Sequence, residues 1–550
     1  MSRELRREKM ARAFTILIVD DDLGEAEAAL LAHFKKYRPS WSFRFAHTAE
    51  EARTLLDQHA PDAVVLDLTL GHGASTGLDL LQHFRRQLAA VPFILIAGSN
   101  EGRLLRDAFL REKVTDEHSL AEINPDGILF REELLSDGPF SALEAQIAAG
   151  LHRCGRVDNE TGILITHGTD TMAWGFAYLH YALSGLTANV AITGSQIPLG
   201  GYFTESDALG NLRTAVYLLN RLRPARLFAV FNNGRSVFSG RLTKYRKWDT
   251  DAFEGRIIAS ASSGEVRPLR KNWVYIPYSD QRLAHLHLFR TGGTIESQRD
   301  VADEGGLKPT GDFVWKYVTG SLGEFFADAT KHDLFALDSS NMSCDQWAEI
   351  ASALETLGVA KADTRFDPTV KPVFCNPLFT TLDYRAQFAA CGGGAILAGF
   401  GGGNANVREG SPHSILPALR ASVEAGTFVA VTSQVPLEPY DAEYETGLAL
   451  LEAGGVPCGD LPLADAQVKL SYLLGHSDAI AAKAKATGIE PRCLLTAAFL
   501  SGVTMRRTGS LTAFRDAGGC VVPVRVLPND PFVAHPFDQA LDTVATAVAE

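Results

Sequence analysis

The sequence predicts an α/β protein with more than one domain, and three observations lead to this fold class. Between residues 14 and 130, buried-type strands alternate with amphipathic helices, which is typical of a doubly wound parallel sheet. At residues 162–172, an apolar β-branched run breaks at Gly168 and then continues with helical spacing, which indicates a strand, a tight turn and a helix. A chain of 550 residues is too long for one hydrophobic core, so we expect about three domains.

The composition limits the partners that we expect. Lys and Arg total 52 and Asp and Glu total 65, which gives a formal net charge of −13. An acidic chain without a long basic run argues against nucleic acid as a partner. The N-terminus is charged and no long apolar run is present, so we expect no signal peptide, no membrane span and a cytoplasmic location. The cysteines lack the spacing of metal ligands, and we expect reduced thiols.

Three carboxylates follow strand ends in the first domain. Its strands are expected at residues 14–19, 42–45, 63–67, 93–96 and 127–130. Asp20 and Asp21 come directly after the first of these strands, and Asp67 ends the third. Clustered carboxylates at neighbouring strand ends repel one another unless a cation neutralises them, and Mg²⁺ prefers hard oxygen ligands. The sequence therefore predicts a Mg²⁺ site at this edge of the sheet.

With this strand pattern and these three carboxylates, residues 14–155 resemble the receiver domain of response regulators. The resemblance implies that the three carboxylates bind the metal, that Asp67 is the phospho-acceptor, and that a sensor kinase is a partner. Two positions depart from the pattern, because Ala97 stands in place of a hydroxyl residue and Arg131 in place of a lysine. The arginine keeps a cation near the phosphoryl group, whereas the missing hydroxyl weakens the switch. The alternative is a docking module that is not phosphorylated.

Three turn motifs mark the rest of the chain. His-Gly-Thr-Asp-Thr occupies 167–171, Thr-Gly-Gly-Thr occupies 291–294 after a second strand, and Asp-Ser-Ser-Asn-Met occupies 338–342 before a helix. Turns at the carboxyl ends of parallel strands are where α/β proteins usually place their chemistry. Each motif also has a plain structural interpretation, because Thr169 and Ser339 would serve equally well as helix caps.

Taken together, the three motifs resemble the bacterial L-asparaginase family, and most closely its cytoplasmic type I enzymes. Further blocks match in type and spacing, at residues 190–198, 205–207, 211–222, 227–233, 240–244 and 251–253. The order departs from the family, in which the Thr-Gly-Gly-Thr strand opens the chain and the Asp-Ser-Ser-Asn-Met segment comes second. The sequence is therefore similar to a circular permutant of the larger asparaginase domain, and residues 255–285 are long enough to bridge the old termini.

The resemblance implies a larger domain at residues 159–365 and a smaller one at 366–482, with residues 483–550 as an unassigned extension. In the smaller domain a glycine turn follows the strand expected at 395–398. That turn does not match a dinucleotide fingerprint, because Asn404 stands in place of the third glycine.

Hydrolysis of a carboxamide needs a nucleophile, a proton acceptor and donors for the oxyanion, and it needs no cofactor. The resemblance implies Thr294 as the first nucleophile, with Thr169, Asp170 and Lys244 as a second hydroxyl, carboxylate and lysine group. It further implies that Asp170 holds the α-ammonium group of the substrate, that Ser339 holds its α-carboxylate, and that Ser340, Gly168, Ser195 and Asn404 line the pocket. For Lys244 the plain alternative is a solvated surface lysine.

The mobile loop that follows the nucleophile in the family carries a tyrosine, and residues 296–312 contain none. This segment offers Lys308 and, further on, Tyr317. The leading hypothesis is a homo-oligomeric, receiver-coupled hydrolase that converts L-asparagine to L-aspartate and ammonia, with the choice between asparagine, glutamine and related amides open. The missing tyrosine favours the rival, a non-catalytic module that senses asparagine or aspartate. A tRNA-linked amidotransferase component ranks third, because the chain is acidic and lacks the accessory regions.

Overall fold

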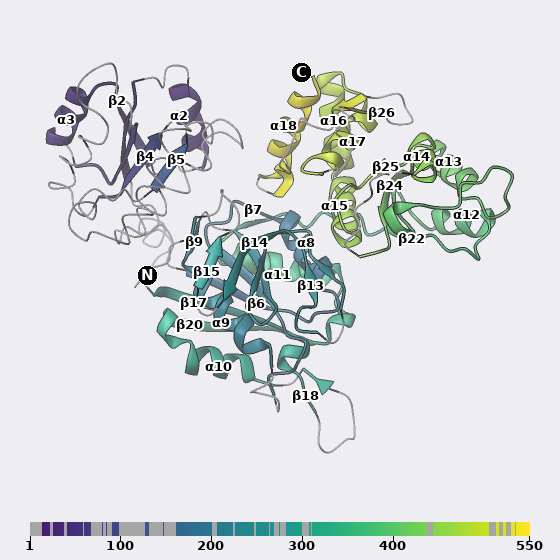
Figure 1. Ribbon diagram of the computed structural model, residues 1–550, viewed down its shortest axis with the longest axis horizontal. Coiled ribbons are helices and arrows are strands. Elements are labelled where there is room, and N and C mark those ends of the chain that lie inside the picture. Colours follow the sequence, from purple (N-terminus) through teal and green to yellow (C-terminus); the bar gives the residue numbers. More distant parts are fainter. Residues whose placement is uncertain are drawn as a thin grey trace. The chain divides into compact units, whose positions relative to one another are not determined.

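Figure 1 shows the computed structural model of the chain, which forms two compact units by its internal contacts. The second unit consists of Gly162–Leu219, Leu227–Arg267 and His285–Glu550. The structure describes residues 14–21, 26–37, 41–58, 60–67, 80, 84, 91–97, 127–130, 143, 147, 161–200, 206–223, 226–246, 249–262, 265–268, 274–275, 282–299, 307–309, 311–436, 440, 444–504, 513–515, 521–523, 530–533 and 535–549.

A five-stranded parallel sheet forms the core of the first unit, as the sequence predicts. Its strands are β1 (Phe14–Val19), β2 (Trp41–Ala46), β3 (Ala63–Asp67), β4 (Phe93–Ala97) and β5 (Gly127–Phe130), in the order β2-β1-β3-β4-β5. Alternate residues of β1 enter two different cores, so that Ile16 packs with Phe34 of α2 (Ala26–Tyr37) and Leu17 packs with Ala52 of α3 (Ala49–Gln58). Helices therefore cover both faces of this sheet.

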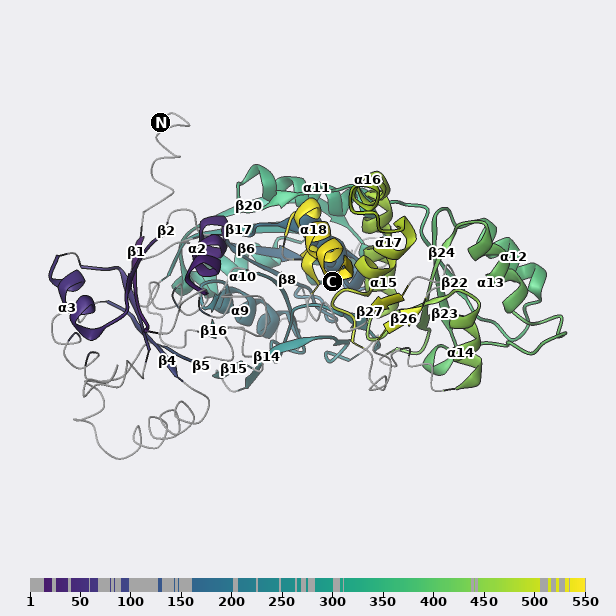
Figure 2. The same ribbon diagram turned by 90° about the horizontal axis from the view of Figure 1, so that it is seen from above.

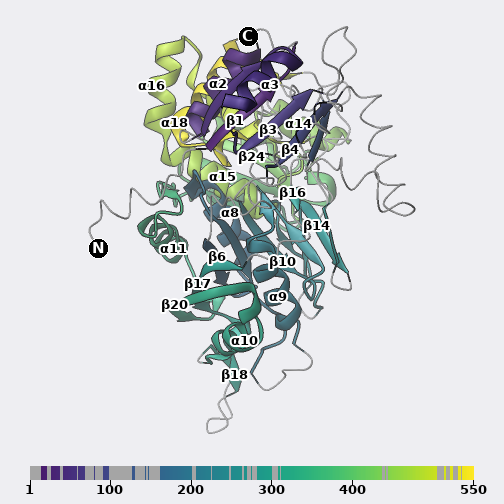
Figure 3. The same ribbon diagram turned by 90° about the vertical axis from the view of Figure 1, so that its left-hand side faces the viewer.

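An eight-stranded sheet organises the second unit, in the order β15-β14-β11-β10-β8-β6-β17-β20. The strands are β6 (Thr161–Thr166), β8 (Asn189–Thr193), β10 (Leu227–Phe231), β11 (Ser236–Phe238), β14 (Ile257–Ser262), β15 (Glu265–Pro268), β17 (Leu283–Gly292) and β20 (Phe326–Leu337). Figure 3 shows β20, β17 and β6 side by side. The strand expected at the first motif and the strand expected at the second are thus neighbours, which confirms that they belong to one sheet.

The helices of this sheet are α8 (Met172–Ala182), α9 (Ala208–Leu219), α10 (Phe313–Ser321) and α11 (Cys344–Thr356). The helix that the sequence places at 211–222 begins earlier, at Ala208, and also ends earlier, because Leu222 already belongs to a short strand. Residues 255–285, which the sequence predicts as the bridge between the old termini, include β14 and β15, which extend the sheet at β11. Their small alternating residues look like a linker, yet they suit a strand in which Ile258 and Ala259 are buried.

A smaller parallel sheet contains β22 (Lys371–Phe374), β23 (Gly394–Gly399), β24 (Phe428–Ser433) and β25 (Val456–Pro457). Around it lie α12 (Thr381–Ala389), α13 (Leu416–Glu424) and α14 (Glu445–Glu452). The remaining strands form short two-stranded pairs. These are β7 (Leu183–Ser184) with β21 (Lys361–Ala362), β9 (Leu222–Arg223) with β16 (Val274–Tyr275), β12 (Thr243–Lys244) with β13 (Phe253–Glu254), β18 (Gln298–Arg299) with β19 (Leu307–Lys308), and β26 (Ala513–Arg515) with β27 (Val521–Pro523).

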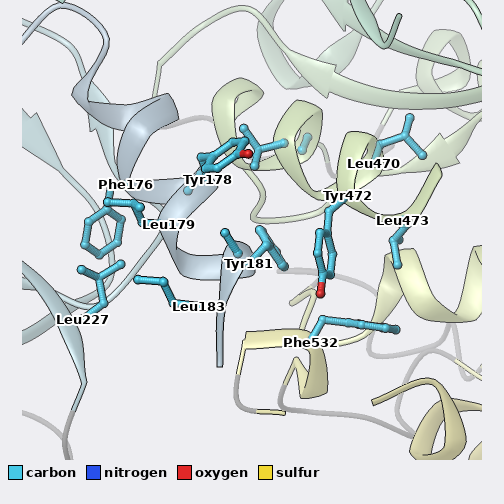
Figure 4. Packing of buried hydrophobic residues seen from close by; sticks show 14 of the residues in the cluster. Phe176, Tyr178, Leu179, Tyr181, Leu183, Leu227, Leu470, Tyr472, Leu473 and Phe532 are labelled. Carbon is cyan, nitrogen blue, oxygen red and sulfur yellow. The ribbon is translucent and has the colours of Figure 1, made fainter. Parts of the chain in front are cut away.

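The C-terminal extension packs into the same core as the two sheets of the second unit. It contains the end of α16 (Ser477–Thr487), α17 (Pro491–Leu500), the 3-10 turn η5 (Pro531–Val533) and α18 (Phe537–Ala549). Figure 2 shows these helices gathered beside α15 (Leu463–Gly475). One hydrophobic cluster joins Ile165 of β6, Ile396 of β23 and Leu541 of α18. In Figure 4, Tyr181 of α8 lies near Tyr472 of α15, and Phe532 follows below.

One expectation about cysteine is wrong. Cys493 of α17 is disulfide-bonded, whereas Cys344, Cys375, Cys391 and Cys458 are free thiols. A disulfide depends on which segments meet in space, and this information is not contained in the spacing of cysteines along the chain. In the part of the chain that the structure describes, no helix has the length and the apolar character needed to cross a membrane.

Candidate active site

Two turns meet at the carboxyl ends of β6 and β17. Thr291 donates a hydrogen bond from its hydroxyl to the backbone oxygen of Thr166 at 2.7 Å, which ties the strand ends together. Beyond this bond, a Cβ atom on Gly293 would lie 2.4 Å from the Cα atom of Gly168. Only glycine permits so close an approach of two backbones, and Gly293 also has a φ of +77°. The motifs at 167–171 and 291–294 therefore face each other directly.

Lys244 joins this meeting point from β12. Its ammonium group donates to the Thr169 hydroxyl at 2.7 Å and to Asp170 Oδ1 at 2.8 Å. Thr169 is buried, whereas the side chain of Asp170 is 59% exposed, so the carboxylate has room for a further cationic partner. The structure thus brings together the hydroxyl, the carboxylate and the lysine that the sequence resemblance places in one group. A lysine bonded to a hydroxyl can relay the proton of that hydroxyl.

Ser339 closes another side of the same turn. It begins the 3-10 turn η3 (Ser339–Asn341), and its hydroxyl accepts a hydrogen bond from the backbone N–H of Asp170 at 3.2 Å. The hydroxyl of Thr171 donates to the backbone oxygen of Ser339 at 2.8 Å. Ser340 lies differently, because its hydroxyl donates to Asp338 at 2.7 Å and thereby helps to cap η3. Of the two predicted serines, only Ser339 contacts the Asp170 turn in the described structure.

Thr294 begins the 3-10 turn η1 (Thr294–Glu296), and among the described residues its hydroxyl has no hydrogen-bond partner. The base of this turn is fixed by charge. Glu296 is fully buried and accepts a hydrogen bond from Arg290 Nε at 2.8 Å. Burial raises the pKa of Glu296, and the charge of Arg290 opposes that effect. The ion pair holds the turn in place while the Thr294 hydroxyl remains available for chemistry.

His167 lies beneath the turn 168–171, and its partner Trp347 was not predicted from the sequence. The indole N–H of Trp347 donates to His167 Nε2 at 3.2 Å, so the ring must carry its proton on Nδ1, which lies 2.7 Å from the backbone oxygen of Gly168. Burial lowers the pKa of His167 to about 4, and the imidazole is therefore neutral at pH 7. His167 orients the backbone of the turn. His167 lies in the first motif and Trp347 in the helix after the third, and only the tertiary structure pairs them.

Ser195 follows β8, the neighbour of β6 in the sheet. The backbone N–H of His167 donates to the oxygen of Thr193 at 2.8 Å, so the Ser195 loop adjoins the turn that carries Thr169. The hydroxyl of Ser195 is fully buried and donates to the backbone oxygen of Ile197 at 2.8 Å. Asp207 accepts bonds from two backbone N–H groups of the same loop, at 3.0 Å each. The loop is therefore rigid, and Ser195 shapes it from within.

Asn404 lies at the glycine turn of the smaller sheet. Its amide donates to the backbone oxygen of Gly401 at 2.7 Å, and its oxygen accepts a bond from the Thr446 hydroxyl at 2.7 Å. These contacts hold the turn closed, and no described contact connects Asn404 with Thr169 or Thr294. The structure does not bring this predicted pocket residue together with the others.

Lys308 and Tyr317, the residues that the sequence offers in place of the loop tyrosine, make no described contact with Thr169 or Thr294. Lys308 is an exposed residue of β19. The hydroxyl of Tyr317 donates to the backbone oxygen of Leu209 in α9 at 3.5 Å, and burial raises its pKa. The intervening residues 300–306 lie outside the described part of the chain.

In the first unit, carboxylate oxygens of Asp20, Asp21 and Asp67 all lie within 4.8 Å of one another. They meet because β1 and β3 are neighbours in the sheet and both end at this edge. Three hard oxygen donors at this separation suit Mg²⁺. Ala97 ends β4, whereas Arg131 lies outside the described residues.

Two segments of the chain match known family profiles. Residues 141–273 match the family described as "Asparaginase, N-terminal", and residues 373–486 match the "Glutaminase/Asparaginase C-terminal domain". η1 and η3, which carry Thr294 and Ser339, fall between the matched segments.

The chain is also similar to individual proteins. The chain is 26% identical to a component of the glutamyl-tRNA(Gln) amidotransferase of Thermococcus kodakarensis over 325 residues, which is 58% of this chain and 55% of the relative. It is 32% identical to L-asparaginase 1 of Escherichia coli strain K12 over 126 residues, 23% of this chain and 36% of the relative. The chain spans about half the length of the amidotransferase components it matches. A solved L-asparaginase from Thermococcus kodakarensis aligns with a TM-score of 0.37 at 20% identity, covering 67% of this chain and 85% of that one.

Proposed function

We propose that this chain, which carries the N- and C-terminal domains of the asparaginase/glutaminase family, hydrolyses L-asparagine to L-aspartate and ammonia. One observation carries the proposal. Lys244 bonds the Thr169 hydroxyl at 2.7 Å and the Asp170 carboxylate at 2.8 Å, directly beside the turn of Thr294. A helix cap or a surface ion pair would need only some of these groups, whereas acyl transfer needs them all within reach of one carbonyl.

The geometry supports a two-step acyl transfer. The Thr294 oxygen attacks the amide carbon, and the Thr169 and Lys244 pair moves the threonine proton toward the leaving nitrogen. The C–N bond breaks, ammonia leaves, and a threonine ester of the substrate remains. Water then attacks the ester carbon, the C–O bond to Thr294 breaks, and the hydroxyl regains its proton. Backbone N–H groups in the turn before α8 are suited to hold the oxyanion.

Substrate binding rests on the two polar groups that flank the turn. Asp170 is exposed beyond its contact with Lys244 and suits an α-ammonium group, because a second cation can bind the free side of its carboxylate. Ser339 lies against Asp170 and suits the α-carboxylate.

The order of the elements supports a circular permutation of the larger domain. The segment that matches the N-terminal family profile ends at residue 273, yet β17 lies beside β6 in the sheet although it comes later in the chain. We place the original start of the domain near β17. We also propose a homo-oligomer, which sedimentation of the purified chain would test.

For the first unit we propose a Mg²⁺ site at Asp20, Asp21 and Asp67, with Asp67 as the phospho-acceptor. The metal would offset the mutual repulsion of the carboxylates and the charge of a phosphoryl group. A sensor kinase would be the partner. Because Ala97 carries no hydroxyl to read the phosphoryl group, we propose weak or constitutive coupling to the hydrolase.

Specific observations favour two other functions. The match to amidotransferase components over 58% of the chain favours a glutaminase that supplies ammonia to a partner. The loop after Thr294 contains no tyrosine, and the Tyr317 hydroxyl is bonded to the backbone oxygen of Leu209. This arrangement favours a non-catalytic sensor.

Ammonia release from L-asparagine, L-glutamine and D-asparagine, measured together with calorimetric binding, separates these functions. We expect release that is fastest from L-asparagine. A strong preference for glutamine would favour the amidotransferase function instead. Binding of asparagine without any turnover would favour the sensor.

A further inference from the structure

The chain adopts an unusual backbone conformation shortly before Lys244. Arg241 has a φ of +57°, in the left-handed region. Among the described residues, the other non-glycine positions with positive φ are Asn232 and Asn233. Asparagine tolerates this region because its short side chain bonds the local backbone, whereas arginine has no such compensation. The tertiary structure must therefore hold Arg241 in place.

Two groups hold the Arg241 side chain, and both come from far along the chain. Its guanidinium donates to the backbone oxygen of Gly502 at 2.8 Å and lies 3.5 Å from Asp460 Oδ1. The same Asp460 oxygen accepts the backbone N–H of Thr504 at 2.8 Å, and the Asp460 N–H donates to the oxygen of Thr504 at 3.0 Å. Asp460 and the turn 502–504 therefore form a clamp around the guanidinium, and the Arg241 side chain is only 13% exposed.

Buried charge holds the turn 502–504 in place. Lys469 is fully buried, and its ammonium donates to the backbone oxygen of Ser501 at 2.6 Å and to Asp530 Oδ2 at 2.5 Å. Gly502 has a φ of +68°, and a Cβ atom there would lie 2.6 Å from the backbone nitrogen of Asp530. The Lys469–Asp530 pair thus holds the Ser501 carbonyl, one residue before the Gly502 carbonyl that receives Arg241, and separating the pair would leave a buried charge without its partner.

Arg241 is linked to Lys244 over a very short stretch. The backbone N–H of Arg256 donates to the backbone oxygen of Gly240 at 2.7 Å. Three residues after Arg241, Lys244 lies opposite Phe253 in the pairing of β12 with β13. Few backbone torsions separate the clamped arginine from the lysine. A displacement of Arg241 must therefore appear at the ammonium group that bonds Thr169 and Asp170.

We propose that Arg241 is a positioning residue for Lys244, and that the C-terminal extension, through Gly502 and Asp530, sets its position. The inference rests on the role proposed above for Lys244. Gly502, Thr504 and Asp530 lie beyond residue 486, where the match to the C-terminal family profile ends. The extension thus serves the active site as well as the core.

A pair of glycine variants tests the proposal in the full chain. Gly488 and Gly502 both lie in the extension at positive φ, +72° and +68°, so alanine imposes the same backbone strain at each. A Cβ atom at Gly488 would meet nothing within 4 Å, whereas at Gly502 it would push against Asp530. Gly488→Ala is therefore the matched control for Gly502→Ala.

We expect Gly502→Ala to lower kcat for asparagine about 10-fold or more while KM changes little, because a small misplacement of a proton-transfer group is costly. Gly488→Ala should retain the parental kcat and show only the fall in Tm that the left-handed backbone causes, because its Cβ atom meets no neighbour. Arg241→Asn, which keeps a residue that accepts positive φ but removes the clamp, should behave like Gly502→Ala, and Arg241→Lys should recover part of the loss.

A second readout does not depend on turnover. Acylation of Lys244 by acetic anhydride, quantified by peptide mass spectrometry, should become several-fold faster in Gly502→Ala and Arg241→Asn than in the parent and in Gly488→Ala, because the amine loses its two partners. Equal acylation and equal kcat in both glycine variants would overturn the proposal. A parent that releases no ammonia would instead defeat the proposed function, and the acylation pattern would still decide the positioning role.

Discussion

Gly293 and Gly168 touch through their backbones, with 2.4 Å between the Cα atom of Gly168 and the Cβ position of Gly293. The hydrogen bond beneath them, from Thr291 to Thr166, spans 125 residues of sequence. Because each glycine opens a turn that carries a threonine, this contact sets the separation of Thr169 and Thr294.

The first prediction concerns this glycine contact. Gly293→Ala should lower kcat for asparagine by about 100-fold or more, because the new methyl group must push the two turns apart. Gly185→Ala is the matched control, since Gly185 has a φ of +62° and open space around its Cβ position. Alanine should cost roughly 1–2 kcal/mol of stability at either position through the left-handed backbone alone. Equal activity of the two variants, measured by ammonia release, would contradict the role of the contact.

The second prediction concerns the two threonines. Thr294→Ala and Thr169→Ala should each lower kcat by roughly 10³-fold with the fold intact, the order expected for the loss of a nucleophile or of its activated partner. Thr319→Ala, at an exposed position on α10, should leave kcat unchanged. Near-parental turnover in either site variant would rule out the mechanism proposed here.

The third prediction concerns pH and His167. Its pKa of about 4 in the folded chain lies below the ordinary value near 6.5. Above pH 6.5 the His167 ring is neutral in both the folded and the unfolded chain. As the pH falls, the ring binds a proton first in the unfolded chain, so the free energy of unfolding decreases by up to about 3 kcal/mol by pH 4. Asp465 acts in the opposite direction, because burial raises its pKa to about 6.

The difference in the free energy of unfolding between the parent and His167→Gln isolates the contribution of the histidine to the pH dependence. In urea titrations between pH 7 and pH 4, we expect the stability of the parent to fall relative to that of the variant, whose glutamine cannot titrate. Parallel curves over this range would show that His167 is not held neutral.

The fourth prediction concerns the acidic cluster. Asp67→Asn should weaken Mg²⁺ binding at least 10-fold in calorimetry, because it removes one of three carboxylates that lie within 4.8 Å of one another. Glu50→Gln, which removes an exposed charge from α3, should not. With Mg²⁺ and a small phosphodonor, we expect kcat/KM for asparagine to change less than about tenfold in the parent and not at all in Asp67→Asn. Identical Mg²⁺ affinities in the two variants would argue against a metal site.

The sequence by itself predicted the α/β class, the five strands of the first unit, several strands of the second and the motifs at 167–171 and 291–294, because β-branched runs and glycine turns are local signals. It also placed Asp20 and Asp67 at strand ends, and the sheet order 2-1-3 then brings them together. The helix at Ala208–Leu219 and the strands β14 and β15 were placed less well, since small polar residues fit both a linker and an edge strand.

The resemblance already grouped Lys244 with Thr169 and Asp170, and the tertiary structure adds which atoms are in contact. No local pattern connects His167 with Trp347 or Arg241 with the carbonyl of Gly502, because each of these pairs joins segments that meet only when separate elements pack. The resemblance grouped Asn404 with the pocket, yet its amide is bonded to Gly401 and Thr446. Local propensity determines where strands and turns begin, whereas long-range burial and hydrogen bonding determine which turns share a site.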